Sequence, residues 1–257
     1  MPDDYQDAGA FIKDVIGGKR NFRGAYFRQG MDLSGHPEFD KLADYFHDES
    51  LSRRLEANPM DLTGASMVGL KARTLLIPYV KAQRIQLAGA NLQNGSFSYG
   101  DFENADFTEA QLSGADISRA KLMGAYMLRI GLVKAFLDNA SFRGANMDRA
   151  YMMACRADGA DFSYAKMKRA DLTEASLVAA ILQNADLTDA DISKADMRGT
   201  RMREARLVRA KLVDVKNLET SEDLGCALFM DTVIKPRELE IIEGARSEVN
   251  LFNVIED

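Results

Sequence analysis

Few residues in this sequence of 257 are of a type that could carry out acid–base, nucleophilic or metal chemistry. The two histidines, His36 and His47, are spaced so that one helical face would hold both only if a helix began unusually early. Neither cysteine, Cys155 nor Cys226, has an identifiable activating partner. Gly17-Gly18-Lys19-Arg20 lacks the spacing and the Ser or Thr of a phosphate-binding loop. We therefore expect no catalytic residue, no metal site and no cofactor, and we interpret the protein as a non-enzyme.

The charge is balanced along most of the chain. Lys and Arg number 33 against 39 Asp and Glu, and the whole excess of six acids comes from the last 43 residues. Residues 85–214 hold 17 of each sign, which argues against a basic nucleic-acid binder. The sequence has no apolar run long enough for a membrane helix and no apolar signal core near Met1. These features predict a cytoplasmic protein.

The sequence repeats every five residues, and this repeat determines the backbone structure that must position any functional residue. From Ile85 to Ala210, 20 of the 26 positions spaced by five are Ala, and the residue two places later is Leu, Ile, Met or Phe in 25 of 26 cases. This period fits neither a helix nor a long strand. A chain that turns two residues inward and three outward in every five must coil around an axis. In one pentapeptide the large inward position holds the small Ala157 and the small position holds the larger Cys155, which keeps their summed volume roughly constant.

The pattern A-(D/N)-L-x-x resembles the pentapeptide-repeat family, as in Ala-Asn-Leu-Gln-Asn (90–94), Ala-Asp-Phe-Thr-Glu (105–109) and Ala-Asp-Leu-Thr-Asp (185–189). The resemblance implies an all-β solenoid, a right-handed quadrilateral β-helix with four pentapeptides per coil. Residues 20 apart would then stack. Asp171, Asp191 and Lys211 should accordingly form a solvated ladder rather than an acid–base pair.

The resemblance also divides the chain into three parts. Residues 60–214 are the expected β-helix, regular from 85 and distorted over 70–84 around Pro78. Residues 1–59 form an N-terminal cap with a repeat fragment at 20–27 and a helix over 37–58, which either covers the coil or projects from it. Residues 215–257 form an acidic C-terminal cap with a short helix from Pro236. Its strand-like segment 249–255 docks either on its own chain or on a second copy as a homodimer.

Two outward surfaces are candidate binding sites for a protein partner. The first follows the face whose large residues are Leu87, Phe107, Met127, Met147, Met167, Leu187 and Leu207. It is a basic stripe that could hold a carboxylate- or phosphate-rich partner or could be paired with neighbouring acids; its arginines are Arg129, Arg149 and Arg169. The second is an apolar cluster, which a partner or another part of the chain could cover. Its members are Tyr126, Leu128, Val133, Phe136, Tyr151 and Met153.

Three functions are compatible with these features. A protein-binding scaffold would dock a macromolecule on the outer faces of a rigid rod. The resemblance also suggests a DNA-mimicking inhibitor or protector of DNA gyrase of the quinolone-resistance type, although the balanced charge of residues 85–214 departs from the acidic surface of a mimic. A third possibility is an accessory or effector module whose activity resides in the N-terminal region. We favour the scaffold, whose partner the sequence does not identify.

Overall fold

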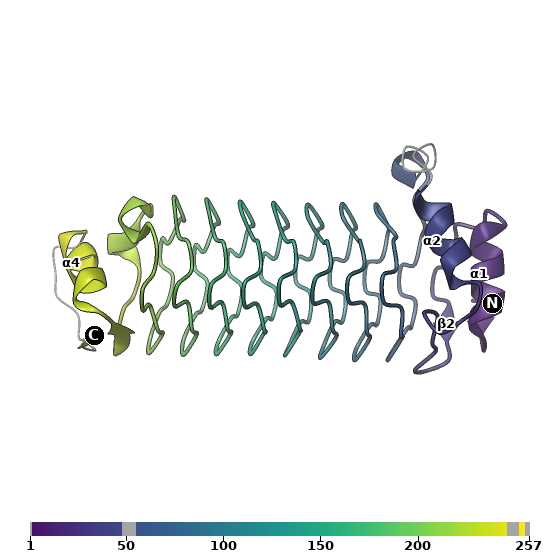
Figure 1. Ribbon diagram of the computed structural model, residues 1–257, viewed down its shortest axis with the longest axis horizontal. Coiled ribbons are helices and arrows are strands. Elements are labelled where there is room, and N and C mark those ends of the chain that lie inside the picture. The colour runs from purple at the N-terminus through teal and green to yellow at the C-terminus, as the bar shows by residue number, and fades with distance from the viewer. Residues whose placement is uncertain (1, 48–54, 246–251, 255–257) are drawn as a thin grey trace.

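The computed structural model describes residues 2–47, 55–245 and 252–254. It is a rod built of stacked coils, with helices at both ends (Figure 1). Parallel β-bridges join residues 20 apart in an unbroken series, from Asp61↔Lys81 to Asp196↔Lys216. Four pentapeptides therefore complete one coil, and each coil is hydrogen-bonded to the coil before and after it. The expected β-helical coil with four pentapeptides per turn is confirmed.

Each pentapeptide ends in the same backbone turn. Every fifth residue from Gly64 to Asp214 has a positive φ. In most of these turns the following residue donates its backbone N–H to the carbonyl three residues earlier, as Gly95 does to Leu92 at 3.2 Å; Val80 and Val215 are the exceptions. This is the pattern of a type II turn, in which the third residue is left-handed. Pro78 occupies the second position of one such turn, which its fixed φ suits. The left-handed turn residues and the bridges continue through 70–84, although the Pro78 turn lacks the hydrogen bond from Val80 to Ile77.

The Asp or Asn of the repeat stabilises this turn. The Oδ1 atom of Asp106 accepts the backbone N–H of Thr108 at 2.9 Å, and Asp161 and Asp171 do the same for the residues two places on. A short carboxylate at this position thus accepts a hydrogen bond from the second turn residue. This explains why Asp and Asn precede the large apolar residue so often.

The two inward positions of each pentapeptide fill the interior. Phe142 and Phe162 are fully buried and stack with ring centroids 4.9 Å apart and planes inclined by 6°. Leu70 and Ala72 exchange the usual order of small and large, as do Val80 and Ala82, and all four are buried. A void of about 20 Å³ remains among the side chains of these first coils. The inward side chains of the regular coils are buried throughout.

The four faces of the coil are named here by the bridge series along them. Face 1 carries Asp106, Tyr126, Asn146, Lys166 and Asp186; face 2 carries Gly131, Tyr151, Asp171, Asp191 and Lys211; face 3 carries Asp116, Phe136 and Arg156; face 4 carries Asp101, Lys121, Ser141 and Asp161. The turns between successive faces form the corners. Face 1 lies opposite face 3, and face 2 lies opposite face 4, because ten residues correspond to half a coil.

The N-terminal end combines two helices and a partial coil. Strand β1 (Asp4–Tyr5) pairs in parallel with β2 (Tyr26–Phe27), which in turn bridges to Ser66 on the first coil. Helix α1 (Ala8–Ile16) begins after Asp7, whose carboxylate accepts the N–H of Ala10 at 2.9 Å, and ends at Gly17. Gly17-Gly18 is therefore the end of a helix. The repeat fragment at 20–27 lies on the first coil and extends it.

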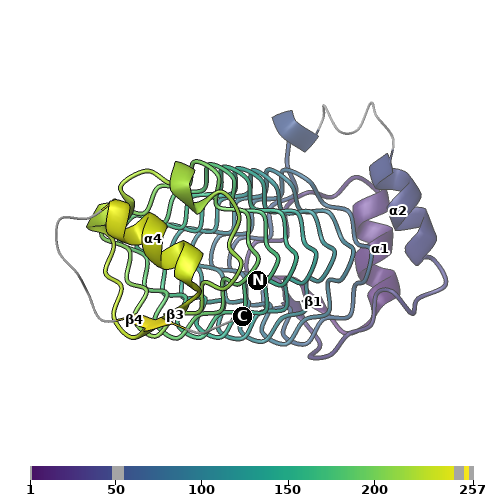
Figure 2. The same ribbon diagram turned by 60° about the vertical axis from the view of Figure 1, so that its left-hand side comes forward.

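Helix α2 (Phe39–His47) packs against α1 at this end of the rod (Figure 2). Phe39, Leu42 and Phe46 are buried, as their helical spacing predicts. The helix expected over 37–58 begins at Phe39 rather than Pro37, and residues 55–57 are helical as well, whereas 48–54 lie outside the described residues. The described part of the segment therefore packs on the N-terminal end.

The C-terminal end departs from the 20-residue spacing. The bridges Arg201↔Glu222 and Arg206↔Leu228 show that the last coil contains additional residues, which include the short 3-10 helices η1 (Leu218–Thr220) and η2 (Leu224–Cys226). Strand β3 (Thr232–Ile234) follows, then helix α4 (Pro236–Gly244), which confirms the helix predicted from Pro236. Strand β4 (Phe252–Val254) pairs in parallel with β3 of the same chain. Of the segment 249–255, the described residues thus dock within the chain.

Candidate interaction surface

The residues that could carry out chemistry are separated from one another. The Nδ1 atom of His36 accepts the backbone N–H of Glu38 at 3.2 Å, and His47 ends helix α2. Burial raises the pKa of the Cys155 thiol to about 12, so this thiol stays neutral at physiological pH. Among the described residues, no three His, Cys, Asp or Glu side chains gather as metal ligands.

Asp171 and Asp191 lie on adjacent rungs of face 2, as the stacking predicts. Each accepts a backbone N–H, from Thr173 at 3.0 Å and from Ser193 at 3.1 Å. Lys211 places its ammonium 3.5 Å from the Asp191 carboxylate. Both carboxylates thus accept a hydrogen bond from a turn, and Asp191 also pairs with Lys211.

A groove of about 640 Å³ lies at the C-terminal end between η1, η2 and α4. Its polar lining includes Glu219, Asp223, Cys226 and Glu240. Cys226 is exposed, and the lining contains no histidine, lysine or arginine that could activate its thiol. We assign this groove no function.

The arginines of the basic stripe all lie at the corner between faces 1 and 2, but their surroundings differ. Arg129 contacts Glu109 at 3.1 Å, 20 residues earlier. Arg169 is 3.8 Å from Asp189, whose carboxylate is bound more closely by Arg209 at 2.7 Å. The hydrogen bond from Arg209 lowers the pKa of Asp189. Most of the stripe is therefore paired across coils.

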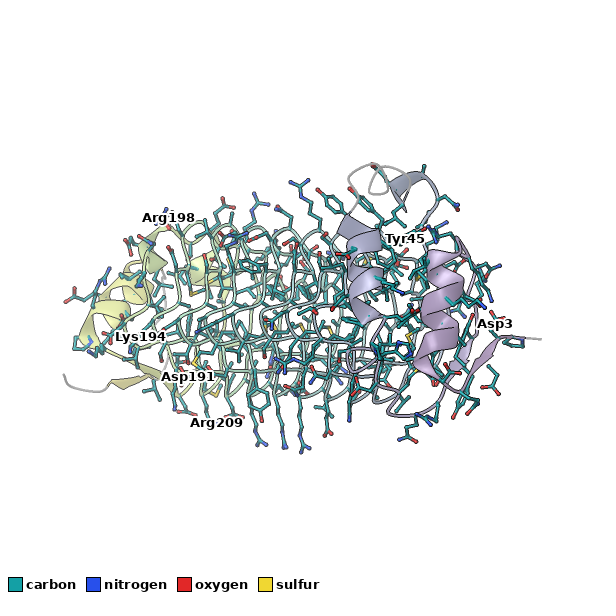
Figure 3. All side chains as sticks on the ribbon, turned by 45° about the vertical axis from the view of Figure 1, so that its right-hand side comes forward. Asp3, Tyr45, Asp191, Lys194, Arg198 and Arg209 are labelled. Carbon is teal, nitrogen blue, oxygen red and sulfur yellow. The ribbon has the colours of Figure 1, made fainter. Side chains whose placement is uncertain are left out.

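Arg149 differs from the other arginines of the stripe. It is exposed and forms no ion pair with any residue that the structure describes. Its left-handed backbone places it at the outermost point of the turn. Arg209, on the same corner, and Arg198, on the corner between faces 3 and 4, mark opposite edges of the rod (Figure 3). Arg149 is thus an unpaired cation on the edge that Arg209 marks.

The predicted apolar cluster is divided among three faces. Tyr126 belongs to face 1, Tyr151 to face 2 and Phe136 to face 3. Leu128 and Val133 are half-buried at the turns that follow, whereas Met153 is exposed. Since faces 1 and 3 are opposite, one flat partner surface cannot contact both Tyr126 and Phe136. Only Tyr126, Leu128 and Tyr151 are grouped around the corner that carries the arginines.

The architecture is that of a β-helical repeat protein whose variable side chains lie outside a filled coil. A model of pentapeptide repeats matches residues 85–124, 158–193 and 180–216, with eight copies. These segments match pentapeptide repeats, as the sequence predicts, and the chain is similar to pentapeptide-repeat proteins over this part of its length. No curated protein matches it by sequence.

Solved structures share the fold at low identity. A trypsin-treated variant of QnrB1, a plasmid-mediated fluoroquinolone resistance protein, has 18% identity and a TM-score of 0.56, covering 72% of this chain and 95% of its own. HetL, a pentapeptide repeat protein involved in heterocyst differentiation regulation in the cyanobacterium Nostoc sp. strain PCC 7120, has 22% identity and a TM-score of 0.49, covering 88% and 98%. QnrB1 supports the fold alone. Among the described residues, no helix is both long and apolar enough to cross a bilayer.

Proposed function

We propose that this protein is a non-enzymatic, protein-binding scaffold that docks a macromolecular partner on the outer faces of its rod. The observation that supports the proposal is the difference in role between the inward and the outward residues of each pentapeptide. The inward residues fill the coil, as the buried Phe142 and Phe162 do, and the outward residues are held on a continuous hydrogen-bonded frame. Such a frame presents side chains at fixed spacing over a long surface, which suits recognition of another macromolecule.

The ends of the rod belong to the same proposal. Terminal coils expose apolar cross-sections and unpaired edges, which invite aggregation. We propose that residues 1–59 and 215–257 cap a right-handed rod formed by 60–214, and that the protein works in the cytoplasm. If residues 215–257 join two copies into a homodimer, light scattering will give twice the mass of 28.5 kDa. A monomer at all concentrations would contradict this homodimer.

The scaffold proposal is tested by affinity purification of the tagged full chain from its native host after nuclease treatment. We expect one protein to be retained in stoichiometric amount and to bind again when both proteins are purified. Failure of every retained protein to bind again would contradict the proposal. The tagged chain with Phe142→Ala, which weakens the fold, serves as the control for retention by an unfolded chain.

DNA gyrase is the second candidate partner, on the strength of the fold shared with QnrB1. A DNA mimic should carry mostly carboxylates on its coils, but residues 85–214 hold 17 acids and 17 bases. Supercoiling by purified gyrase, measured with and without the protein and with ciprofloxacin, distinguishes the two functions. We expect no change in either assay; inhibition or drug protection would favour the mimic.

A further inference from the structure

Three of the exposed aromatic rings on the coils are already covered by the protein's own arginines. Arg156 lies over the ring of Phe136 at 5.0 Å, and Arg119 over Tyr99 at 5.4 Å. Arg143 covers Tyr164 at 5.2 Å. Each of these contacts joins neighbouring coils and uses a cation–π interaction that is available within the chain. One side of each of these rings is thus already in contact with the protein itself.

Tyr126 and Tyr151 are not covered in this way. Their exposed fractions are 59% and 53%, and neither makes a ring, cation or side-chain hydrogen-bond contact with the described residues. Tyr26 is a third uncovered ring, but it lies four rungs away on the first coil. Tyrosines with open rings are the side chains most enriched at the centres of protein interfaces.

Two unpaired cations lie beside these tyrosines. Arg149 is three residues beyond Asn146, which bridges both Tyr126 and Lys166 on face 1. Lys166 is exposed and, like Arg149, forms no ion pair among the described residues. Tyr151 follows Arg149 after one residue and begins face 2. Two open rings and two free cations therefore adjoin one corner within three successive coils.

The charges around this group favour a short acidic ligand over a nucleic acid. Asp148 lies at the same corner, where its Oδ1 accepts the backbone N–H of Lys168 at 2.9 Å. Glu109 and Asp189 border it on either side along the rod. A long polyphosphate backbone would meet these carboxylates, since duplex binding uses continuous stretches of basic residues. A short peptide with a few carboxylates can pair with Arg149 and Lys166 without extending along the rod, although Asp148 and Asp186 lie beside these cations.

Resting on the scaffold function, we propose that the corner formed by Tyr126, Arg149, Tyr151 and Lys166 is the docking surface for an acidic segment of a partner protein. The carboxylates of the segment pair with the guanidinium and the ammonium, neither of which has an ion-pair partner in the described part of the chain. The tyrosine rings on either side pack against its apolar groups. Leu128, half-buried between them, adds apolar surface at the base of the corner.

The test uses the purified full chain and a labelled glutamate-rich peptide that contains one phenylalanine. We expect saturable binding in fluorescence anisotropy that weakens as salt rises. The Arg149→Glu/Lys166→Glu variant should bind about tenfold more weakly or worse, because it replaces both cations by like charges. Lys121→Glu/Lys81→Glu is the matched control, since both lysines lie on face 4, away from the corner, and have no ion pair among the described residues. It should stay within about twofold of wild type.

Three results would overturn the inference: no binding of the peptide by wild type, equal loss in the face 4 control, or stronger binding of a short duplex DNA than of the peptide. Unchanged melting temperatures of both variants show that the fold is intact. The affinity purification separates this inference from the scaffold proposal. A native partner retained equally by the corner variant contradicts the docking surface alone, and failure of wild type to retain any partner contradicts the scaffold itself.

Discussion

The inward and outward positions of the coil follow different rules. Inside, Ala145 and Phe142 are held at 0% exposure by neighbours in three coils, so the size of each side chain is constrained. Outside, positions at one corner can carry Gly89, Glu109 or Arg149 on the same left-handed backbone. The comparison shows that the packing of the core depends on two residues in five. The remaining three face outward, and within the limits of the turn they are available for recognition. The predictions below test this difference, from the largest expected effect to the smallest.

Phe142→Ala should have the largest effect. Its ring stacks on Phe162 in a filled interior, and its removal leaves a cavity that the rigid coils cannot close. We expect a loss of about 3–5 kcal/mol in the free energy of unfolding. Urea denaturation followed by circular dichroism measures it. A loss below that of an exposed substitution such as Tyr126→Ala would contradict the buried stack.

Ala145→Leu should overfill the coil at a fully buried small position. We expect a loss of about 1–3 kcal/mol, measured by the same denaturation. Ile130, which is also buried at a small position, supplies the control: Ile130→Leu should change the stability less than Ala145→Leu. The reverse order would mean that the small positions are not sterically restricted.

Ala179→Gly should stabilise the protein. Ala179 is exposed and has a φ of 55°, a conformation that costs energy in every residue except glycine. We expect a gain of about 0.5–1 kcal/mol, because the relief of this cost exceeds the added freedom of the unfolded chain. Ala180→Gly, one residue further and fully buried, should instead destabilise. Thermal melts of the two variants shifting in the same direction would be inconsistent with the shared turn.

Arg149→Ala should leave stability almost unchanged. The side chain is exposed and unpaired among the described residues, so the change in the free energy of unfolding should stay within about 0.5 kcal/mol. A melting temperature lowered as far as that of Phe142→Ala would refute its outward placement.

Much of the coil could be predicted from the sequence, because every pentapeptide has the same inward positions and the same turn. Phe142 and Phe162 share a stack because they are 20 residues apart, and Arg129 meets Glu109 for the same reason. The coil continues through 70–84 because a type II turn accepts proline at its second position, although the turn at Pro78 lacks its closing hydrogen bond.

The rest of the molecule was harder to predict. Helix α1 was missed although Asp7 and the spacing of Phe11, Ile12 and Val15 signal it. The grouping of Tyr126 with Phe136 failed because residues close in sequence point to opposite sides of a coil. Which rings the arginines cover depends on side-chain conformation across coils, as between Phe136 and Arg156, and the pattern of five carries no information about it.

The uniform coil of 20 residues has a consequence for how such a chain can change in length. Deleting or duplicating one whole coil, such as residues 105–124, leaves the turn geometry and the faces of all other residues as they were. The rod would become shorter or longer by one strand spacing, about 4.8 Å. Two docking points on the same edge could thus be moved apart in fixed steps without any change in direction, which makes the repeat a natural unit for adjusting the reach between bound partners.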